Sequence, residues 1–192
     1  MAKRPIFKAG SPVLRQRARK VNSFDDSLRA LVRDLTETMR DAPGIGLAAP
    51  QIGVPLRVFV AQLSAEREEN DDEDEVPAER SRARRRRGSR SDDPEILYVL
   101  CNPEIVKVWG EEESVEGCLS LPGYVGEVSR ATRVLVKGQD ISGKRIRVRA
   151  NGLLARVFQH EIDHLKGLMF TDRLESMEKL RRLEPAEDEP ST

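Results

Sequence analysis

The two histidines of the chain lie four residues apart, at His160 and His164, and Glu161 directly follows the first. Residues i and i+4 share one face of an α-helix, so both imidazoles can reach a single metal ion if this segment is helical. Glu161 then lies about 100° further round the helix, close enough to serve a metal-bound water without being a ligand. This spacing predicts a metal-dependent hydrolase.

A catalytic metal site usually has three protein ligands and one open position for water. Downstream of His164, the remaining candidate side chains are acidic, and a zincin-like metallopeptidase with such a ligand stays open; the candidates are Glu175, Glu178 and Glu184. Upstream, Cys118 lies among turn-forming residues in the segment 116–123, which indicates a constrained loop that presents a thiol. Cys101 ends an apolar run and is expected to be a small buried hydrophobe.

The histidine pair falls in a helix predicted over residues 152–166 and ended by Gly167. A second helix is predicted over 25–41, with Ser23 or Asp25 as its N-cap, and the stretch 175–184 has helical composition. Aliphatic and β-branched runs predict strands over 56–60, 96–100, 105–109, 133–136 and 145–148. Strands with few helices between them predict an α+β fold.

The length predicts one catalytic domain over residues 1–192, but residues 64–94 differ in composition from the rest. Nine carboxylates lie between residues 66 and 79, and seven arginines follow between residues 80 and 90. Such a segment cannot offset its ordering entropy by burial, so we expect a flexible insertion. The arginines offer a contact for RNA or a ribosome, although a solvated loop whose two halves neutralise each other is the favoured interpretation. The acidic tail, 185–192, is expected to fray.

The overall charge excludes some classes of partner. The chain has 33 basic and 33 acidic residues, which argues against a whole-molecule field for nucleic acid, and no sequence-specific nucleic-acid partner is expected. No apolar run approaches the roughly 20 residues of a membrane span, and the first residues do not resemble a signal peptide. We therefore expect a cytoplasmic protein, with no membrane partner, whose two cysteines are reduced.

Three segments taken together resemble the peptide deformylase family. They are Gly-Ile-Gly-Leu-Ala-Ala-Pro-Gln at 44–51, Glu-Gly-Cys-Leu-Ser at 116–120 and Gln-His-Glu-Ile-Asp-His-Leu at 159–165, in this order. The resemblance implies antiparallel strands packed around a central metal-binding helix. It also implies an enzyme that removes the N-formyl group from the N-terminal methionine of newly synthesised proteins and releases formate. Its partners would be the formyl-Met nascent polypeptide and the ribosome.

The same resemblance implies a role for each matching residue. Cys118, His160 and His164 would hold one divalent metal ion, with iron(II) expected and zinc or nickel able to occupy the same ligands. Glu161 would act first as general base and then as general acid. The Gln51 side chain and the backbone N–H of Leu119 would stabilise the tetrahedral oxyanion.

Substrate-binding positions follow from the resemblance as well. The backbone of Ile45 and Gly46 would pair with the peptide like an added strand. Leu153 and Val157 would line the pocket for the methionine side chain. Arg156 departs from the apolar residue expected there, and its methylene stem can substitute while its charged head reaches water. A supporting ion pair would join Glu116 and Arg130.

Overall fold

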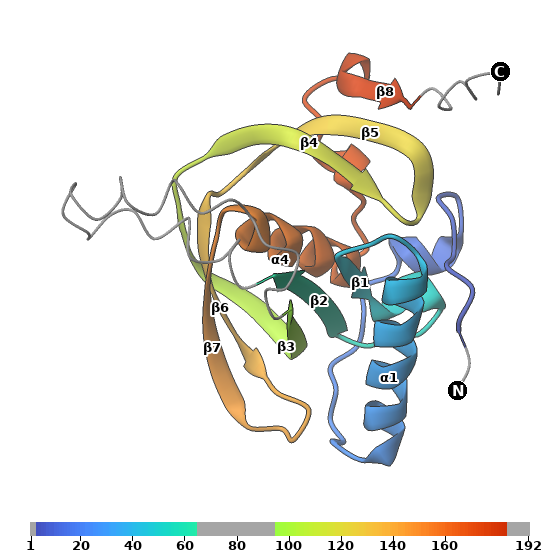
Figure 1. Cartoon of the computed structure of the whole chain (residues 1–192), viewed down its shortest axis with the longest axis vertical. Helices are drawn as coiled ribbons and strands as arrows, with labels where there is room; N and C mark the ends of the chain where they lie inside the picture. The colour runs from blue at the N-terminus through green and yellow to red at the C-terminus, as the bar shows by residue number, and fades with distance from the viewer. Residues whose placement is uncertain (1–2, 65–94, 184–192) are drawn as a thin grey trace, which may run out of the picture.

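A computed structural model describes residues 3–64 and 95–183, in which one helix lies between two antiparallel sheets (Figure 1). The central helix is α4 (Gly152–Leu165). The larger sheet has the strand order β1 (Gly46–Ala48), β2 (Val58–Ser64), β3 (Glu95–Trp109), β6 (Arg133–Gln139) and β7 (Arg145–Asn151). The smaller sheet has the order β4 (Glu112–Cys118), β5 (Leu121–Arg130) and β8 (Leu180–Arg182). The predicted α+β fold with antiparallel strands around the metal-binding helix is confirmed.

The remaining elements are one long helix and four short 3-10 segments. They are α1 (Asp26–Asp41), η1 (Pro12–Arg15), η2 (Ala49–Ile52), η3 (Phe170–Arg173) and η4 (Met177–Lys179). The predicted charged insertion, apart from its first residue, and the predicted acidic tail lie outside the described residues. No helix within the described ranges is both long and apolar enough to cross a membrane.

Helix α4 is placed by its apolar side, which packs on the inner face of the larger sheet. Leu154, Phe158 and Ile162 recur every four residues and are buried in the same core cluster as the sheet residue Phe59. The helix ends where predicted, because Gly167 has a φ of +79° and a Cβ there would lie 2.6 Å from the Arg15 carbonyl oxygen. Both constraints favour glycine at this position. The opposite side of α4 is therefore left to face the smaller sheet.

The hairpin of β4 and β5 carries Cys118, and sequence patterns did not predict either strand. Four residues of β4 are exposed and only Glu116 is fully buried, so the strand lacks the apolar alternation of a half-buried strand. Cys118 is the last residue of β4, beside a register shift at Gly117, so a strand end presents the thiol rather than the predicted constrained loop. The backbone of Ala9 donates to the Ser120 carbonyl at 2.7 Å and so ties the N-terminal segment to the hairpin turn.

Helix α1 supports the site from the other side of the larger sheet's first strands. Asp25 caps it, because its Oδ1 accepts from the backbone N–H groups of Ser27 at 3.0 Å and Leu28 at 3.2 Å. Its apolar face packs against β1 and β2 in a second core cluster; the buried residues are Leu28, Leu31, Val32, Leu35 and Met39. The predicted helix and its second suggested cap, Asp25, are confirmed.

Two predictions of secondary structure are wrong. The described part of the stretch 175–184 forms η4 and then β8, which pairs with β5, and not a helix. Pairing with a distant strand satisfies its backbone groups and so overrides the local helical composition. The strands predicted at 96–100 and 105–109 are one strand, β3, with two register shifts. One lies between Cys101 and Glu104, where Asn102 has a φ of +52°, and the other lies between Ile105 and Lys107. The Asn102 side chain compensates by bonding both backbone groups of Val21, each at 2.9 Å.

Candidate metal centre and active site

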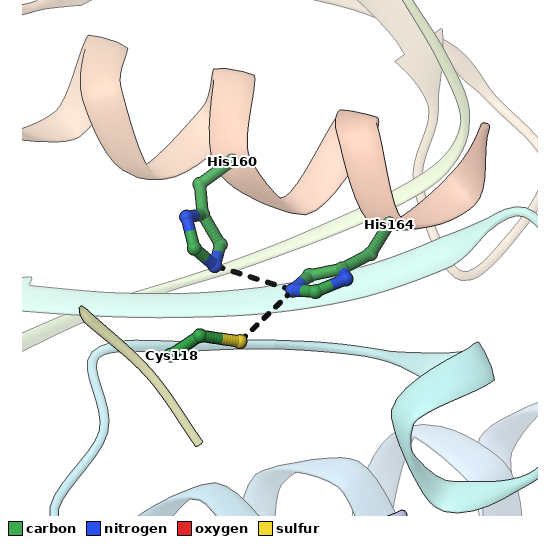
Figure 2. Close-up of side chains that lie close together, drawn as sticks. All are labelled: Cys118, His160 and His164. Carbon is green, nitrogen blue, oxygen red and sulfur yellow. Dashed lines mark hydrogen bonds between the residues drawn. The ribbon is translucent and has the colours of Figure 1, made fainter. Parts of the chain in front are cut away.

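The three predicted ligand side chains converge between α4 and the end of β4, as Figure 2 shows. His164 Nε2 lies 3.2 Å from His160 Nε2 and 3.3 Å from Cys118 Sγ. Within residues 3–64 and 95–183, these three side chains form the one group whose potential ligand atoms all lie within 4.8 Å of one another. The downstream acids Glu175 and Glu178 are not part of it, and residue 184 lies outside the described ranges.

The ring nitrogens that face one another are the ones free to bind a metal ion. His160 Nδ1 lies 2.9 Å from Glu116 Oε2, and because a carboxylate only accepts, this nitrogen carries the hydrogen. The lone pair of a neutral His160 is then on Nε2, which points at Cys118 and His164. Burial, followed by the charge of His160, lowers the pKa of His164 well below its usual value, which favours a neutral imidazole. Burial alone would lower the pKa of His160, but hydrogen bonds with Cys118 and Glu116 and the charge of Glu161 outweigh it and raise the pKa to about 10, so a metal ion that binds here must displace a proton from this ring. A cysteine sulfur and two imidazoles that have become neutral in this way are a donor set that suits a divalent transition metal.

The ligand His160 is held by a buried ion pair. Arg130 contacts both oxygens of Glu116, with Nε to Oε1 at 2.8 Å and Nη2 to Oε2 at 3.0 Å. Burial alone would raise the pKa of Glu116, but hydrogen bonds from His160 and Arg130 and their charges outweigh it and lower the pKa to about 2. Glu116 is therefore an ionised acceptor for the His160 ring, and the predicted pair with Arg130 is confirmed.

Glu161 is a buried carboxylate at the wall of the cleft, only 3% exposed. Its Oε2 has no hydrogen-bond partner within the described part of the chain. Burial raises the pKa of Glu161 to about 7, against the lowering effect of the charge of His160. A Cβ at position 46 would lie 2.5 Å from Glu161 Oε1 and 2.9 Å from Val157 Cγ1. Gly46 therefore allows β1 to approach this carboxylate closely.

Gln51 lies in η2 with its amide held in one orientation. Its Oε1 accepts from the backbone N–H of Ala48 at 2.8 Å, which turns Nε2 towards Cys118 Sγ at 3.6 Å and Ser120 Oγ at 3.2 Å. Gln51 is only 1% exposed, so it is not a solvated loop residue. Leu119 lines the cleft beside it, and its carbonyl accepts a hydrogen bond from Lys8 Nζ at 2.9 Å.

A cleft of about 560 Å³ opens beside these groups. All four predicted substrate-binding residues line it; they are Ile45, Gly46, Leu153 and Val157. Arg156 lines it too, and its Nη2 lies 3.5 Å from Glu112 Oε2 at the start of β4. The volume is typical of a pocket for a small molecule or a short peptide end.

Several residues near the site carried no assigned role in the sequence prediction. Ser120 accepts a hydrogen bond from Gln51, Asp163 accepts one from Arg130, and Arg173 donates to Asp163. Ser120 and Asp163 lie within the motifs already quoted. The exposed apolar residues Val115 and Tyr124 line the cleft from β4 and β5. Because the sequence patterns predicted neither strand, nothing in the sequence placed these two side chains at the cleft. Cys101, in contrast, is fully buried in the core as predicted, and burial raises the pKa of its thiol to about 11.

The fold, the group formed by Cys118, His160 and His164, and the buried Glu161 are those of a metal-dependent hydrolase. The sequence model of the polypeptide deformylase family matches residues 3–180, so the chain belongs to that family. The chain is therefore an enzyme, a metal-dependent hydrolase that removes the formyl group from an N-terminal methionine. This family membership favours deformylation over the zincin-like alternative.

Similarity to known proteins covers nearly the whole chain. It is 43% identical over 189 residues to the peptide deformylase of Thermomicrobium roseum, covering 98% of this chain and 96% of that one. The peptide deformylase of Chloroflexus aggregans is 44% identical over 172 residues, with 88% and 84% covered. The crystal structure of a peptide deformylase from Legionella pneumophila is similar with a TM-score of 0.73 at 40% identity, covering 93% of this chain and 89% of that one.

Proposed function

We propose that Cys118, His160 and His164 hold one divalent metal ion, and that iron(II) is the metal used. The convergence of the sulfur and the two Nε2 atoms supports the ligand set. Zinc and nickel suit the same donors, so iron(II) rests on the resemblance to the family. When bound, such an ion lowers the pKa of a water molecule and so supplies a nucleophile near neutral pH.

Glu161 is the general base and then the general acid in this proposal. It takes a proton from the water that attacks the formyl carbon, and it delivers that proton to the methionine nitrogen as the carbon–nitrogen bond breaks. Formate and a free amine are the products. Support comes from the burial of Glu161, its unpartnered Oε2 and its position directly after the ligand His160.

Gln51 Nε2 and the backbone N–H of Leu119 donate to the oxyanion that forms on the formyl oxygen. Neutral donors held in advance stabilise a developing charge without reorganising during the reaction. The bond from Ala48 to Gln51 Oε1 supports this assignment, because it keeps the amide hydrogens of Gln51 directed at the metal site.

The formyl-Met peptide binds along β1 in this proposal. β1 is the first strand in the order of the larger sheet, so the backbone of Ile45 and Gly46 can pair with the peptide as an added strand. The methionine side chain enters the apolar part of the cleft beside Leu153 and Val157. Residues 1–192 act as one catalytic domain, and the enzyme works in the cytoplasm at the ribosome, where formylated chains emerge.

The convergence of Cys118 with the two histidines carries the proposal, and the variant Cys118→Ser tests it. We expect the wild type to release formate from a formyl-Met peptide with iron, nickel or zinc bound, and Cys118→Ser to lose both metal and activity. The control Cys101→Ala changes a cysteine buried in the core, away from the cleft, and should keep both. A wild type that releases no formate with any of these metals, or a Cys118→Ser protein with unchanged metal content, contradicts the proposal.

A further inference from the structure

Arg130 is shared between two buried carboxylates that lie on different elements. Its Nε and Nη2 bind Glu116 of β4, and its Nη1 lies 2.5 Å from Asp163 Oδ2 of α4. The three side chains are each no more than 5% exposed. Two carboxylates therefore compete for one guanidinium group in a place where solvent screens their charges weakly.

A second arginine neutralises the outer carboxylate. Arg173, at the end of η3, binds both oxygens of Asp163, with Nη2 to Oδ1 at 2.6 Å and Nε to Oδ2 at 3.0 Å. Its side chain is 42% exposed, so the series of charges begins at the surface. From there the charges alternate in sign through Asp163, Arg130 and Glu116 to the Nδ1 of His160.

This series connects a surface residue to the orientation of a metal ligand. If Arg173 is absent, Asp163 has Arg130 as its one remaining ion-pair partner among the described residues and attracts it more strongly. Arg130 is the group that fixes both oxygens of Glu116, and Glu116 in turn fixes the tautomer and the ring plane of His160. Outer partners of a ligating histidine typically contribute 10–100-fold to metal affinity.

We propose that Asp163 and Arg173 are positioning residues, which act through Arg130 and Glu116 to hold His160 ready for metal binding. The inference rests on the proposed metal site and extends it beyond the three ligands. The alternative is that the pair only fastens η3 to α4, in which case its loss lowers stability and leaves the metal site unchanged.

The test compares Arg173→Met with the matched control Arg181→Met. Arg181 also pairs with a carboxylate, Glu127 at 2.8 Å, but on the surface of β8 and β5, away from the metal site. We expect Arg173→Met to raise the dissociation constant for zinc, measured by competition with a chelator, by about tenfold. The visible absorption bands of the cobalt(II) protein should shift as well, because the ligand geometry changes. Arg181→Met should change neither.

Two further substitutions separate an effect on zinc affinity from a general loss of stability. Arg173→Lys keeps the charge but cannot bind both oxygens at once, so it should give a smaller rise than Arg173→Met. Asp163→Asn keeps the shape of the side chain and removes the charge that competes for Arg130, so adding it to Arg173→Met should bring the dissociation constant for zinc back towards the wild-type value. In turnover, kcat of Arg173→Met should fall while KM for the formyl-Met peptide stays unchanged, since Arg173 does not line the cleft.

A wild-type zinc affinity and an unshifted cobalt spectrum in Arg173→Met overturn the inference, even if the variant unfolds at a lower temperature. That result leaves the proposed function intact. Failure of the proposed function looks different, because the wild type itself would then bind neither zinc nor cobalt through Cys118.

Discussion

Helices α1 and α4 are similar in length and both pack against the larger sheet, yet they bury different kinds of side chain. α1 buries five apolar residues, and its two buried threonines bond to backbone atoms or accept from them. α4 also buries four side chains that carry charge or strong polarity, namely Gln159, Glu161, Asp163 and His164. The burial of α1 is explained by the core alone, whereas the burial of α4 requires a further reason.

That reason lies in how the polar groups of α4 are satisfied. Gln159 bonds to backbone atoms of Ala131 and Ala155, and Asp163 bonds to two arginines. Glu161 Oε2 and His164 Nδ1 have no hydrogen-bond partner within the described ranges. Burying a polar atom without a partner costs about 1–3 kcal/mol, so such atoms gather where they serve chemistry. The comparison teaches that the kind of group that is buried, rather than amphipathicity, separates a catalytic helix from a supporting one.

The strongest test of this difference makes the same substitution in both helices. Glu161→Gln in α4 should lower kcat by about 10²–10⁴-fold, because the amide can neither take nor deliver the proton. Metal content should stay unchanged, since Glu161 is not a ligand. Formate release and metal analysis of one sample measure both quantities. Glu37→Gln, on the less buried side of α1, is the control and should change neither; equal activity of the two variants would show that Glu161 has no part in proton transfer.

The second test removes core packing from α1. Leu35 is fully buried, so Leu35→Ala should lower the free energy of unfolding by about 2–5 kcal/mol. Because α1 contributes no side chain to the chemistry, kcat at a temperature where the variant is folded should equal that of the wild type. Urea denaturation and formate release are the measurements. A large fall in kcat would mean that α1 does more than support the first strands of the sheet.

The smallest effect is expected at the cap of α1. Hydrogen bonds from the Ser27 side chain and the Leu28 backbone lower the pKa of Asp25 below its ordinary value of 3.8. A carboxylate with a lowered pKa stabilises the folded protein above its ordinary pKa, and this contribution disappears as the pH falls through the lowered value. Asp25→Ala should therefore unfold at a lower temperature than the wild type at pH 7, and the difference between the two should shrink as the pH falls below 3.8. A difference that persists unchanged in acid would mean that the cap does not act through its charge.

Both helices were predictable from the sequence because their signals are local. The periodicity of α1, its cap at Asp25 and the glycine that ends α4 lie within a few residues of the elements that they define. His160 and His164 are one helical turn apart, so their shared face follows from the helix alone. The strands β4 and β5 were missed for the opposite reason, since their polar and glycine-rich sequences acquire strand structure by pairing with each other.

The sequence therefore contained the two histidines, their shared helix, the neighbouring carboxylate and the motifs that resemble the family. It left the third ligand open between an upstream thiol and a downstream acid, because nothing local relates residue 118 or 175 to residue 164. Packing of the β4–β5 hairpin over α4 brings Cys118 within 3.3 Å of His164, and the pairing of β8 with β5 turns the downstream stretch into a strand. The charges from Arg173 to His160 likewise come from four elements, α4, β4, β5 and η3, and such contacts exist only once these elements are packed together.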